Sequence, residues 1–367
     1  MTDTATIPLT FTTTPSPAAK AEAEREAILA DPGFGKYFTD HMATISWSID
    51  EGWHDARVVP YGPLQLDPAA AVLHYAQEIF EGLKVYRHAD GSIWAFRPEA
   101  NARRMQRSAE RLALPQLPEA AFVDAVKRLV EVDAAWVPSA PETSLYVRPF
   151  MIASEAFLGV RAAHGVDFHV IASPAGAYFP GGVRPVSIWL SQDYTRAGRG
   201  GMGAAKTGGN YAASLLPQAE AYEQGCQQVV FLDAEERRYV EELGGMNVFF
   251  VYGDGRVVTP SLSGTILEGI TRESVIRLAK ERGHTVEERR MPIEEWRDGV
   301  ASGAITEVFA CGTAAVITPI GVLKARDFEV GRLDTPAGAL TMSLREELTD
   351  IQYGRREDHH DWMVRLV

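Results

Sequence analysis

The sequence contains only two cysteines, Cys226 and Cys311, which lie far apart and fit no metal-binding spacing. A disulfide framework is therefore not expected, and free thiols are typical of a reducing compartment. No apolar run reaches the length that a membrane span needs. Basic residues are also scarce: 36 of them against 49 acidic residues give a net charge of −13, which argues against nucleic acid and anionic membranes as partners.

The remaining composition is typical of a globular protein. Apolar residues make up 46% and charged residues 23% of the 367 positions, enough for one large domain or two medium ones. Residues 1–20 are rich in Thr, Ala and Pro, and we expect residues 1–32 to be a disordered or loosely attached segment. Residues 1–20 have no apolar core of signal-peptide length and no arginine, which together with the cysteines favours a cytoplasmic location.

Hydrophobic periodicity predicts two lobes. In the first we expect a strand over residues 44–53, helices over 98–112 and 119–132, and strands over 144–153 and 166–173. In the second, strands over 186–190, 228–232, 248–251, 257–259 and 305–310 alternate with helices over 212–224 and 271–282, before a helix-rich segment over 335–356. The fold class is therefore α/β (α+β), with a smaller N-terminal domain at 33–177, a Pro- and Gly-rich linker at 178–190 and a larger domain at 191–367.

Lys206 is the most informative residue. It is one of seven lysines, and it lies in a glycine-rich loop over residues 198–211, with no charged neighbour before it until Arg199 and none after it until Glu220. Burial disfavours the ammonium form of a lysine, and a neutral lysine amine is the nucleophile that forms Schiff bases with carbonyls, including that of pyridoxal phosphate. Glycines allow the backbone to approach such a ligand closely.

The alternative is a phosphate-binding loop of the nucleotide hydrolases, with the pattern G-x-x-x-x-G-K-S/T. Residues 200–207 match it except that Ala205 stands at the second glycine, and residues 229–233 resemble the acidic strand of that class. Gly208 and Gly209 argue against it, because two glycines at the start of the required helix cost roughly 2 kcal/mol of helix propensity.

Four further segments could serve a pyridoxal enzyme. Residues 264–273 lead into a helix whose first N–H groups suit a phosphate, although Thr271 could instead be an N-cap residue. Residues 309–315 run from a strand into a small-residue turn, and residues 239–247 place two acids before a tight turn. Tyr146 and Arg148 lie on one face of a strand, where the arginine could hold a carboxylate or form a surface ion pair. His74 and the Asp-His-His-Asp segment at 358–361 lack metal-ligand spacing, so no metal site is expected.

In this order the motifs resemble those of the branched-chain amino acid aminotransferases, which are class IV (fold type IV) pyridoxal phosphate enzymes. The resemblance runs from about residue 33 onward and is specific. It rests on the motifs at residues 34–42, 74–84, 144–149, 176–182, 206–211, 242–247, 312–314 and 351–354. It implies a two-lobed architecture, a homodimer, pyridoxal 5'-phosphate as cofactor, and amino acids and 2-oxo acids as substrates.

The resemblance also implies a role for each site residue. Lys206 would bond to the cofactor aldehyde, Glu242 would pair with the pyridine nitrogen, and Tyr211 would donate to the phenolate oxygen. The cofactor phosphate would be held by Arg104, Ile270, Thr271 and Thr313. The substrate carboxylates would meet Tyr146, Arg148, Thr313 and Ala314, and the apolar pocket would be formed by Phe34, Tyr178, Tyr75 and Phe80, the last two from a partner subunit.

The implied reaction is a ping-pong transamination between L-leucine, L-isoleucine or L-valine and 2-oxoglutarate, with Lys206 carrying the proton. A sister class IV enzyme, such as a D-amino acid aminotransferase or an aminodeoxychorismate lyase, is the alternative. Two positions depart from the pattern: Ala315 and Thr318 replace a C-x-x-C pair that some members carry, and Gly245 stands where animal enzymes have threonine.

Overall fold

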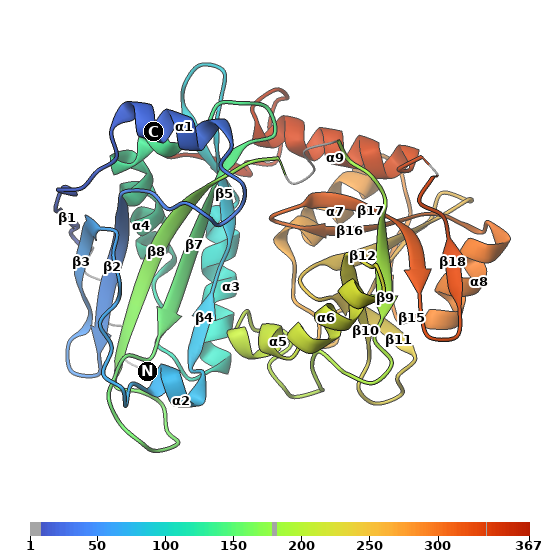
Figure 1. The fold of residues 1–367 in the computed structure, drawn as a ribbon, viewed down its shortest axis with the longest axis horizontal. Helices are drawn as coiled ribbons and strands as arrows, with labels where there is room; N and C mark the ends of the chain where they lie inside the picture. The colour runs from blue at the N-terminus through green and yellow to red at the C-terminus, as the bar shows by residue number, and fades with distance from the viewer. Residues whose placement is uncertain (1–8, 178–181, 335) are drawn as a thin grey trace. The chain divides into compact units, whose positions relative to one another are not determined.

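The structure is a computed structural model that describes residues 9–177, 182–334 and 336–367. The chain forms two compact units, one of Met1–Tyr178 with Ile351–Val367 and one of Phe179–Asp350 (Figure 1). Both are mixed α/β units built on a large sheet. Within the described residues, no helix is long and apolar enough to cross a membrane.

The first unit contains a sheet of nine strands among its described residues, in the order β1-β3-β2-β8-β7-β5-β6-β19, with β4 paired to β7. The strands are β1 (Thr12–Thr13), β2 (His41–Ser48), β3 (Gly52–Pro60), β4 (Glu78–Phe80), β5 (Leu83–Arg87), β6 (Ile93–Phe96), β7 (Ser144–Ile152), β8 (Gly165–Ala175) and β19 (Met363–Arg365). The helices are α1 (Glu22–Ala30), α2 (Ala71–Tyr75), α3 (Pro98–Arg111), α4 (Glu119–Val132) and the short 3₁₀ helix η1 (Ala134–Trp136).

Helix α4 shows how the apolar pattern builds this unit. Its residues at helical spacing are buried, among them Phe122, Val126 and Leu129, and the helix contacts β2, β3 and β8. The Phe122 ring meets that of Phe168 in β8 at 5.9 Å between centroids. The apolar stripe of α4 therefore covers one face of the sheet, as expected for an amphipathic helix.

Three features of the first unit differ from the expectations. The strand expected over 44–53 is a hairpin of β2 and β3 that turns before Gly52, a residue with a positive φ of 69°. Residues 9–32 have a definite path, since β1 pairs with β3 and the Ser16 N–H donates to His41 Nε2 at 2.8 Å. Residues 351–367 belong to this unit rather than to the second, because β19 pairs with β6.

The second unit contains a sheet of ten strands among its described residues, in the order β14-β13-β12-β16-β17-β9-β10-β11-β15, with β18 paired to β17. The strands are β9 (Val186–Leu190), β10 (Gln228–Leu232), β11 (Tyr239–Leu243), β12 (Asn247–Tyr252), β13 (Val257–Pro260), β14 (Val286–Arg289), β15 (Met291–Pro292), β16 (Ile305–Gly312), β17 (Val316–Lys324) and β18 (Glu329–Gly331). The helices are α5 (Gly208–Ala212), α6 (Leu215–Glu223), α7 (Ile270–Glu281), α8 (Ile293–Ser302) and α9 (Ala339–Gln352), which continues into the first unit's segment.

The expected strands of this unit agree closely with β9, β10, β12, β13 and β16. Strand β11 places two acids in the unit. It carries Glu241 and Glu242 as consecutive residues, and because side chains alternate along a strand, the two carboxyl groups lie on opposite faces of the sheet.

Candidate active site

The expected catalytic lysine lies in the segment between β9 and α5. Lys206 is half-buried, and its Nζ donates a hydrogen bond of 2.7 Å to the hydroxyl oxygen of Tyr211 in α5. The side-chain amide of Asn210 holds the preceding loop by donating to the carbonyls of Met202 at 2.8 Å and Ala205 at 2.9 Å. The structure therefore brings Lys206 and Tyr211 together on a loop that is fixed from within.

Close contact between backbones fixes the same loop from outside. The Ala204 N–H donates to the carbonyl of Gly264 at 3.1 Å, and a Cβ on Gly203 would collide with the backbone of Thr265. Only glycine permits this approach at position 203. The glycine-rich composition around Lys206 thus has a packing reason.

Glu242 is the buried acid of this region. Its side chain is 2% exposed; its Oε1 accepts a hydrogen bond of 2.7 Å from the Leu267 N–H and forms an ion pair of 2.9 Å with Arg196 Nη1. Burial raises the pKa of Glu242 to about 7, while Arg196, the Leu267 N–H and Lys206 oppose that rise. A carboxyl group in this environment is suited to share a proton with a ring nitrogen, since its two protonation states are close in free energy at neutral pH.

Arg196 is a residue of this region whose place in the candidate site the sequence analysis did not predict. Its Nη1 also donates to the carbonyls of Thr265 at 2.9 Å and Gly203 at 3.3 Å, so it joins Glu242 to the lysine loop and to the loop before α7. Its side chain is 2% exposed. No local pattern marks it, because Thr265 and Glu242 lie far from it in the sequence.

The expected phosphate-binding residues Ile270 and Thr271 are the first two residues of α7. The N-cap position is Gly269, so the interpretation of Thr271 as an N-cap residue is wrong. A Cβ on Gly269 would collide with Asn247 Oδ1, and Asn247 Nδ2 donates to the Leu267 carbonyl at 3.1 Å. Asn247 of β12 therefore fixes the start of a helix whose first N–H groups have no acceptor within the helix and suit an anion.

Thr313 and Ala314 form the turn between β16 and β17, where Gly312 pairs with Val316. Asn247 pairs with Cys311 across the same sheet, so this turn and the start of α7 are positioned by neighbouring residues of β12 and β16. The pairing of β12 with β16 therefore positions both the start of α7 and the turn at Thr313.

Arg104 lies in the first unit, on α3. It forms a bidentate pair with Glu81, with Nε–Oε1 at 2.8 Å and Nη2–Oε2 at 2.7 Å, and both side chains are buried. Asn101 Nδ2 donates to the same carboxylate at 2.7 Å. Glu81 was part of the motif at 74–84, but no role was predicted for it; its contacts fix the orientation of the Arg104 guanidinium.

Four of the expected substrate-binding residues gather in the first unit. Arg148 Nη2 donates to the Tyr146 hydroxyl at 3.0 Å, and the Arg148 guanidinium lies 4.7 Å from the centroid of Phe80. The Phe34 ring meets the Tyr146 ring edge-on at 5.1 Å. Arg148 and Phe80 of the same chain are therefore in contact, so the expected origin of Phe80 in a partner subunit is not needed for this cluster.

One expected residue, Tyr75, lies outside this cluster. Tyr75, at the end of α2, packs against Phe157 at 6.3 Å between ring centroids and is 39% exposed. Tyr178 lies outside the residues that the structure describes. Among the described residues, no group of three or more His, Cys, Asp or Glu side chains could hold a metal ion.

The comparisons with known proteins agree with this geometry. The family model described as "Amino-transferase class IV" matches residues 78–322. A branched-chain-amino-acid aminotransferase of Mycolicibacterium smegmatis is 60% identical over 98% of this chain and 99% of its own length. Among solved structures, the branched-chain aminotransferase of Thermoproteus uzoniensis with norvaline is similar at a TM-score of 0.73, with 27% identity over 89% of this chain and 100% of that one. The enzyme of Thermobaculum terrenum in its PLP form gives a TM-score of 0.71, with 25% identity over 88% of this chain and 98% of that one.

Proposed function

Because the chain belongs to the class IV aminotransferase family, we propose that it transfers the amino group of L-leucine, L-isoleucine and L-valine to 2-oxoglutarate, with pyridoxal 5'-phosphate as its cofactor. The observation that carries the proposal is the constellation of Lys206, Tyr211 and Glu242, with Arg196 holding the acid. Its residues match those that the resemblance assigns to the cofactor aldehyde, phenolate oxygen and ring nitrogen.

The residues present fit this cofactor. Glu242 Oε1 already has two partners, the Leu267 N–H and Arg196, which leaves the other oxygen of the carboxyl group for the ring nitrogen. The start of α7 and the turn at Thr313 supply N–H and hydroxyl groups for the phosphate, and Arg104 would supply a guanidinium. When bound, the cofactor supplies an aldehyde and a ring that acts as an electron sink.

Lys206 is the residue that moves the proton. Its amine would take the proton from the substrate Cα and return it on the neighbouring cofactor carbon, acting first as general base and then as general acid. The hydrogen bond to Tyr211 fixes the direction in which the Nζ lone pair and protons point. Glu242, held by Arg196, would keep the ring nitrogen protonated during the transfer.

The cluster of Tyr146, Arg148, Phe34 and Phe80 would bind the substrates. Aromatic side chains would contact the aliphatic group of leucine, and the Arg148 guanidinium would meet the distal carboxylate of glutamate. An apolar wall discriminates by only about 1–3 kcal/mol per methylene, so overlapping activity on the three branched amino acids is expected. Ala314, Tyr75 and Tyr178 are proposed to complete the pocket.

A homodimer is part of the proposal. Support comes from apolar side chains that are exposed in the single chain, among them Leu73 at 59%, Leu158 at 74% and Val160 at 94%, which a partner could cover. Light scattering on the purified protein tests it, since a monomer at assay concentration would contradict it. The cytoplasmic location is supported by two buried free cysteines and stays a prediction.

An assay tests the activity directly. The purified protein should be yellow, and borohydride should fix the cofactor on Lys206, as peptide mapping would show. L-leucine with 2-oxoglutarate should give glutamate, whereas D-alanine should not serve as an amino donor. Preference for D-alanine would favour the D-amino acid aminotransferase alternative, and undiminished leucine turnover by Lys206→Ala would refute the role of Lys206.

A further inference from the structure

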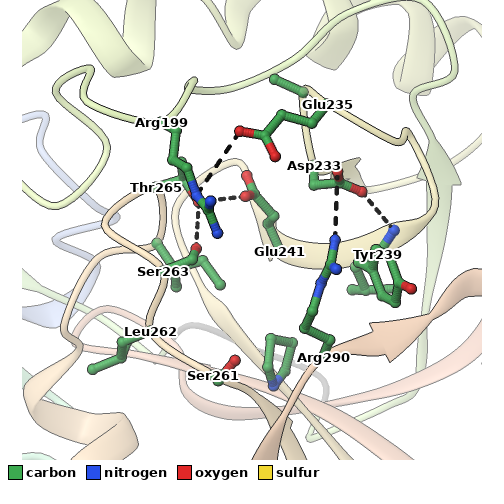
Figure 2. Close-up of a pocket in the computed structure, with 14 residues that line it drawn as sticks. Arg199, Asp233, Glu235, Tyr239, Glu241, Ser261, Leu262, Ser263, Thr265 and Arg290 are labelled. Carbon is green, nitrogen blue, oxygen red and sulfur yellow. Dashed lines mark hydrogen bonds and ion pairs between the residues drawn. The ribbon is translucent and has the colours of Figure 1, made fainter.

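A second pocket lies in the second unit, on the face of β11 that carries Glu241. Its volume is about 220 Å³, and it is enclosed by β11, the β10–β11 turn and residues 260–266 (Figure 2). Its charged lining residues are Arg199, Asp233, Glu235, Glu241 and Arg290. We call it the Glu241 pocket. Among the described residues, none that was assigned above to the cofactor or the substrate lines it.

Glu241 is the acceptor in this pocket. It is only 5% exposed, its Oε1 accepts a hydrogen bond from the Thr265 hydroxyl, and its Oε2 has no hydrogen-bond partner among the described residues. A buried carboxylate oxygen without a donor is unfavourable, because it has lost its hydrogen bonds to water. Burial raises the pKa of Glu241 accordingly. The pocket therefore favours an occupant that brings an N–H donor, and a positively charged one would keep Glu241 ionised.

The other acids of the pocket have partners. Asp233 accepts backbone N–H groups from Glu236 at 2.7 Å, Arg238 at 3.0 Å and Tyr239 at 2.7 Å, which makes it a turn-forming residue. Glu235 is exposed and pairs with Arg199 at 3.8 Å. Glu241 is thus the acid in this pocket whose geometry points to a ligand.

The rim supplies the opposite charge. Arg290 forms an ion pair with Glu236 at 2.7 Å and stacks on the Tyr239 ring. The Arg199 side chain is 73% exposed, and within the described part of the chain its ion pair is the long one with Glu235 at 3.8 Å. Figure 2 shows Arg199, Glu235 and Glu241 directed toward the same part of the pocket. An exposed guanidinium with a weak partner can turn to bind a carboxylate.

The side chains of Leu262 and Ile266 add apolar surface to a lining that also contains Ser261 and Ser263. At about 220 Å³ the pocket is far larger than the space of a single water and smaller than the usual site of a drug-sized ligand. A small molecule with an ammonium group, a carboxylate and an aliphatic side chain matches this pocket. The ammonium group would meet Glu241, the carboxylate would meet Arg199, and the side chain would meet Leu262 and Ile266.

We propose that the Glu241 pocket binds the zwitterion of a small aliphatic α-amino acid, with its ammonium group at Glu241 and its carboxylate at Arg199. Thr265 connects this site to the candidate active site, because its hydroxyl donates to Glu241 while its carbonyl accepts from Arg196, the partner of Glu242. Binding here is a separate event from substrate binding and does not depend on the proposed function.

Calorimetric titration with L-leucine tests the proposal. The protein is first reduced with borohydride in the presence of its cofactor, so that no amino group can be transferred. We expect a binding event that is weakened about tenfold or more in both Glu241→Gln and Arg199→Gln, since each removes a charge-assisted hydrogen bond. Glu294→Gln, which removes an acid of the same unit outside the pocket, should leave the event unchanged. Isoamylamine and 4-methylpentanoate, which each lack one of the two charges, should bind more weakly than leucine.

Identical isotherms for the wild type and both pocket variants would overturn the proposal. A crystal soaked in L-leucine that shows only a water at Glu241 Oε2 would overturn it as well. Because Arg199 is exposed, Arg199→Gln gives a reading even if Glu241→Gln does not fold. A protein that takes up no cofactor would refute the proposed function instead, and the same titration on that protein would still decide about the pocket.

Discussion

The ion pair between Arg196 and Glu242 leads to the sharpest prediction, which concerns Arg196→Met. Both side chains are 2% exposed and their charged atoms are 2.9 Å apart. Methionine removes the charge and keeps much of the volume. The variant leaves Glu242 buried without its cation, so the carboxyl group must either stay ionised and unpaired or take up a proton, and removing one partner of a buried pair costs about 3–5 kcal/mol.

That cost converts into a shift of the unfolding temperature. For a domain of 150–250 residues, 1 kcal/mol lowers Tm by about 2–4 °C, so we expect Tm to fall by about 6–20 °C in the cofactor-free protein at pH 8. The matched control is Arg238→Met, which breaks an ion pair of 3.3 Å whose side chains are 53% and 44% exposed. Such exposed pairs contribute about 0–1 kcal/mol, so this control should change Tm by no more than about 4 °C.

A double-mutant cycle separates the ion pair from other effects of Arg196. Glu242→Gln removes the buried negative charge, so the combined variant should lose at least about 1 kcal/mol less than the two single variants added together. The measurement is thermal unfolding followed by near-ultraviolet circular dichroism. Additive losses in the cycle, or an equal loss in the Arg238→Met control, would refute the reasoning that the ion pair carries the stability.

Three further predictions concern pH, thiol reactivity and the N-terminal segment. Because the pKa of Glu242 is raised by burial from 4.5 to about 7, the folded protein holds this proton more tightly than the unfolded chain does. The stabilisation that comes from this proton is therefore complete below about pH 4.5 and is lost as the pH rises through 7. Over that range, the difference in unfolding free energy between wild type and Glu242→Gln should change by roughly 3 kcal/mol. A difference that does not change with pH would contradict this prediction. Burial raises the pKa of the Cys311 thiol to about 12 and also raises that of Cys226, so a disulfide reagent at pH 7 should modify neither in the native protein and both after unfolding. In the native protein, the buried His41 backbone N–H and Nδ1 lie 3.0 and 2.7 Å from the Asp133 carboxylate, and Asp133→Ala removes this acceptor. We expect the unfolding free energy to fall by about 1–3 kcal/mol and proteolytic cleavage of residues 9–20 to become faster. Unchanged cleavage would show that this contact does not hold the segment.

Local patterns predicted the regular elements well. The apolar spacing of residues 119–132 gave α4 with its bounds, and the apolar runs at 186–190 and 228–232 gave β9 and β10. Each of these elements buries an uninterrupted stripe or run of apolar residues, so the helix or strand that its sequence favours locally is also the one that the folded protein needs there.

Elements interrupted by proline or glycine were missed. Strand β17 contains Pro319 and Gly321 and shows a register shift between Ile320 and Val322, so its sequence looks like a loop. Helix α8 contains Gly299, where a Cβ would lie 2.6 Å from Ile305 Cδ1, so close packing on β16 requires the glycine. Helix α5 does begin at Gly208 despite the two glycines, but it is only five residues long, and the class IV family match agrees with the rejection of a phosphate-binding loop.

The candidate site was predictable where motifs carry it. Lys206, Tyr211 and Glu242 were assigned through the resemblance, and the structure shows the first two in contact. Arg196 and Glu81 were not predicted to act in the site, since their roles consist of contacts with residues distant in the sequence. The definite path of residues 9–20 was missed for the same reason: His41 and Asp40 hold it through the N–H groups of Ser16 and Lys20, and composition gives no sign of this.

The pairing of β19 with β6 has a consequence for biosynthesis. During translation, β6 leaves the ribosome early, but the strand that covers its edge is made only after the whole second unit. Until residues 363–365 emerge, the nascent chain exposes the unpaired N–H and C=O groups of β6, which could pair with another nascent chain. The first sheet can thus be completed only after the second unit has been synthesised.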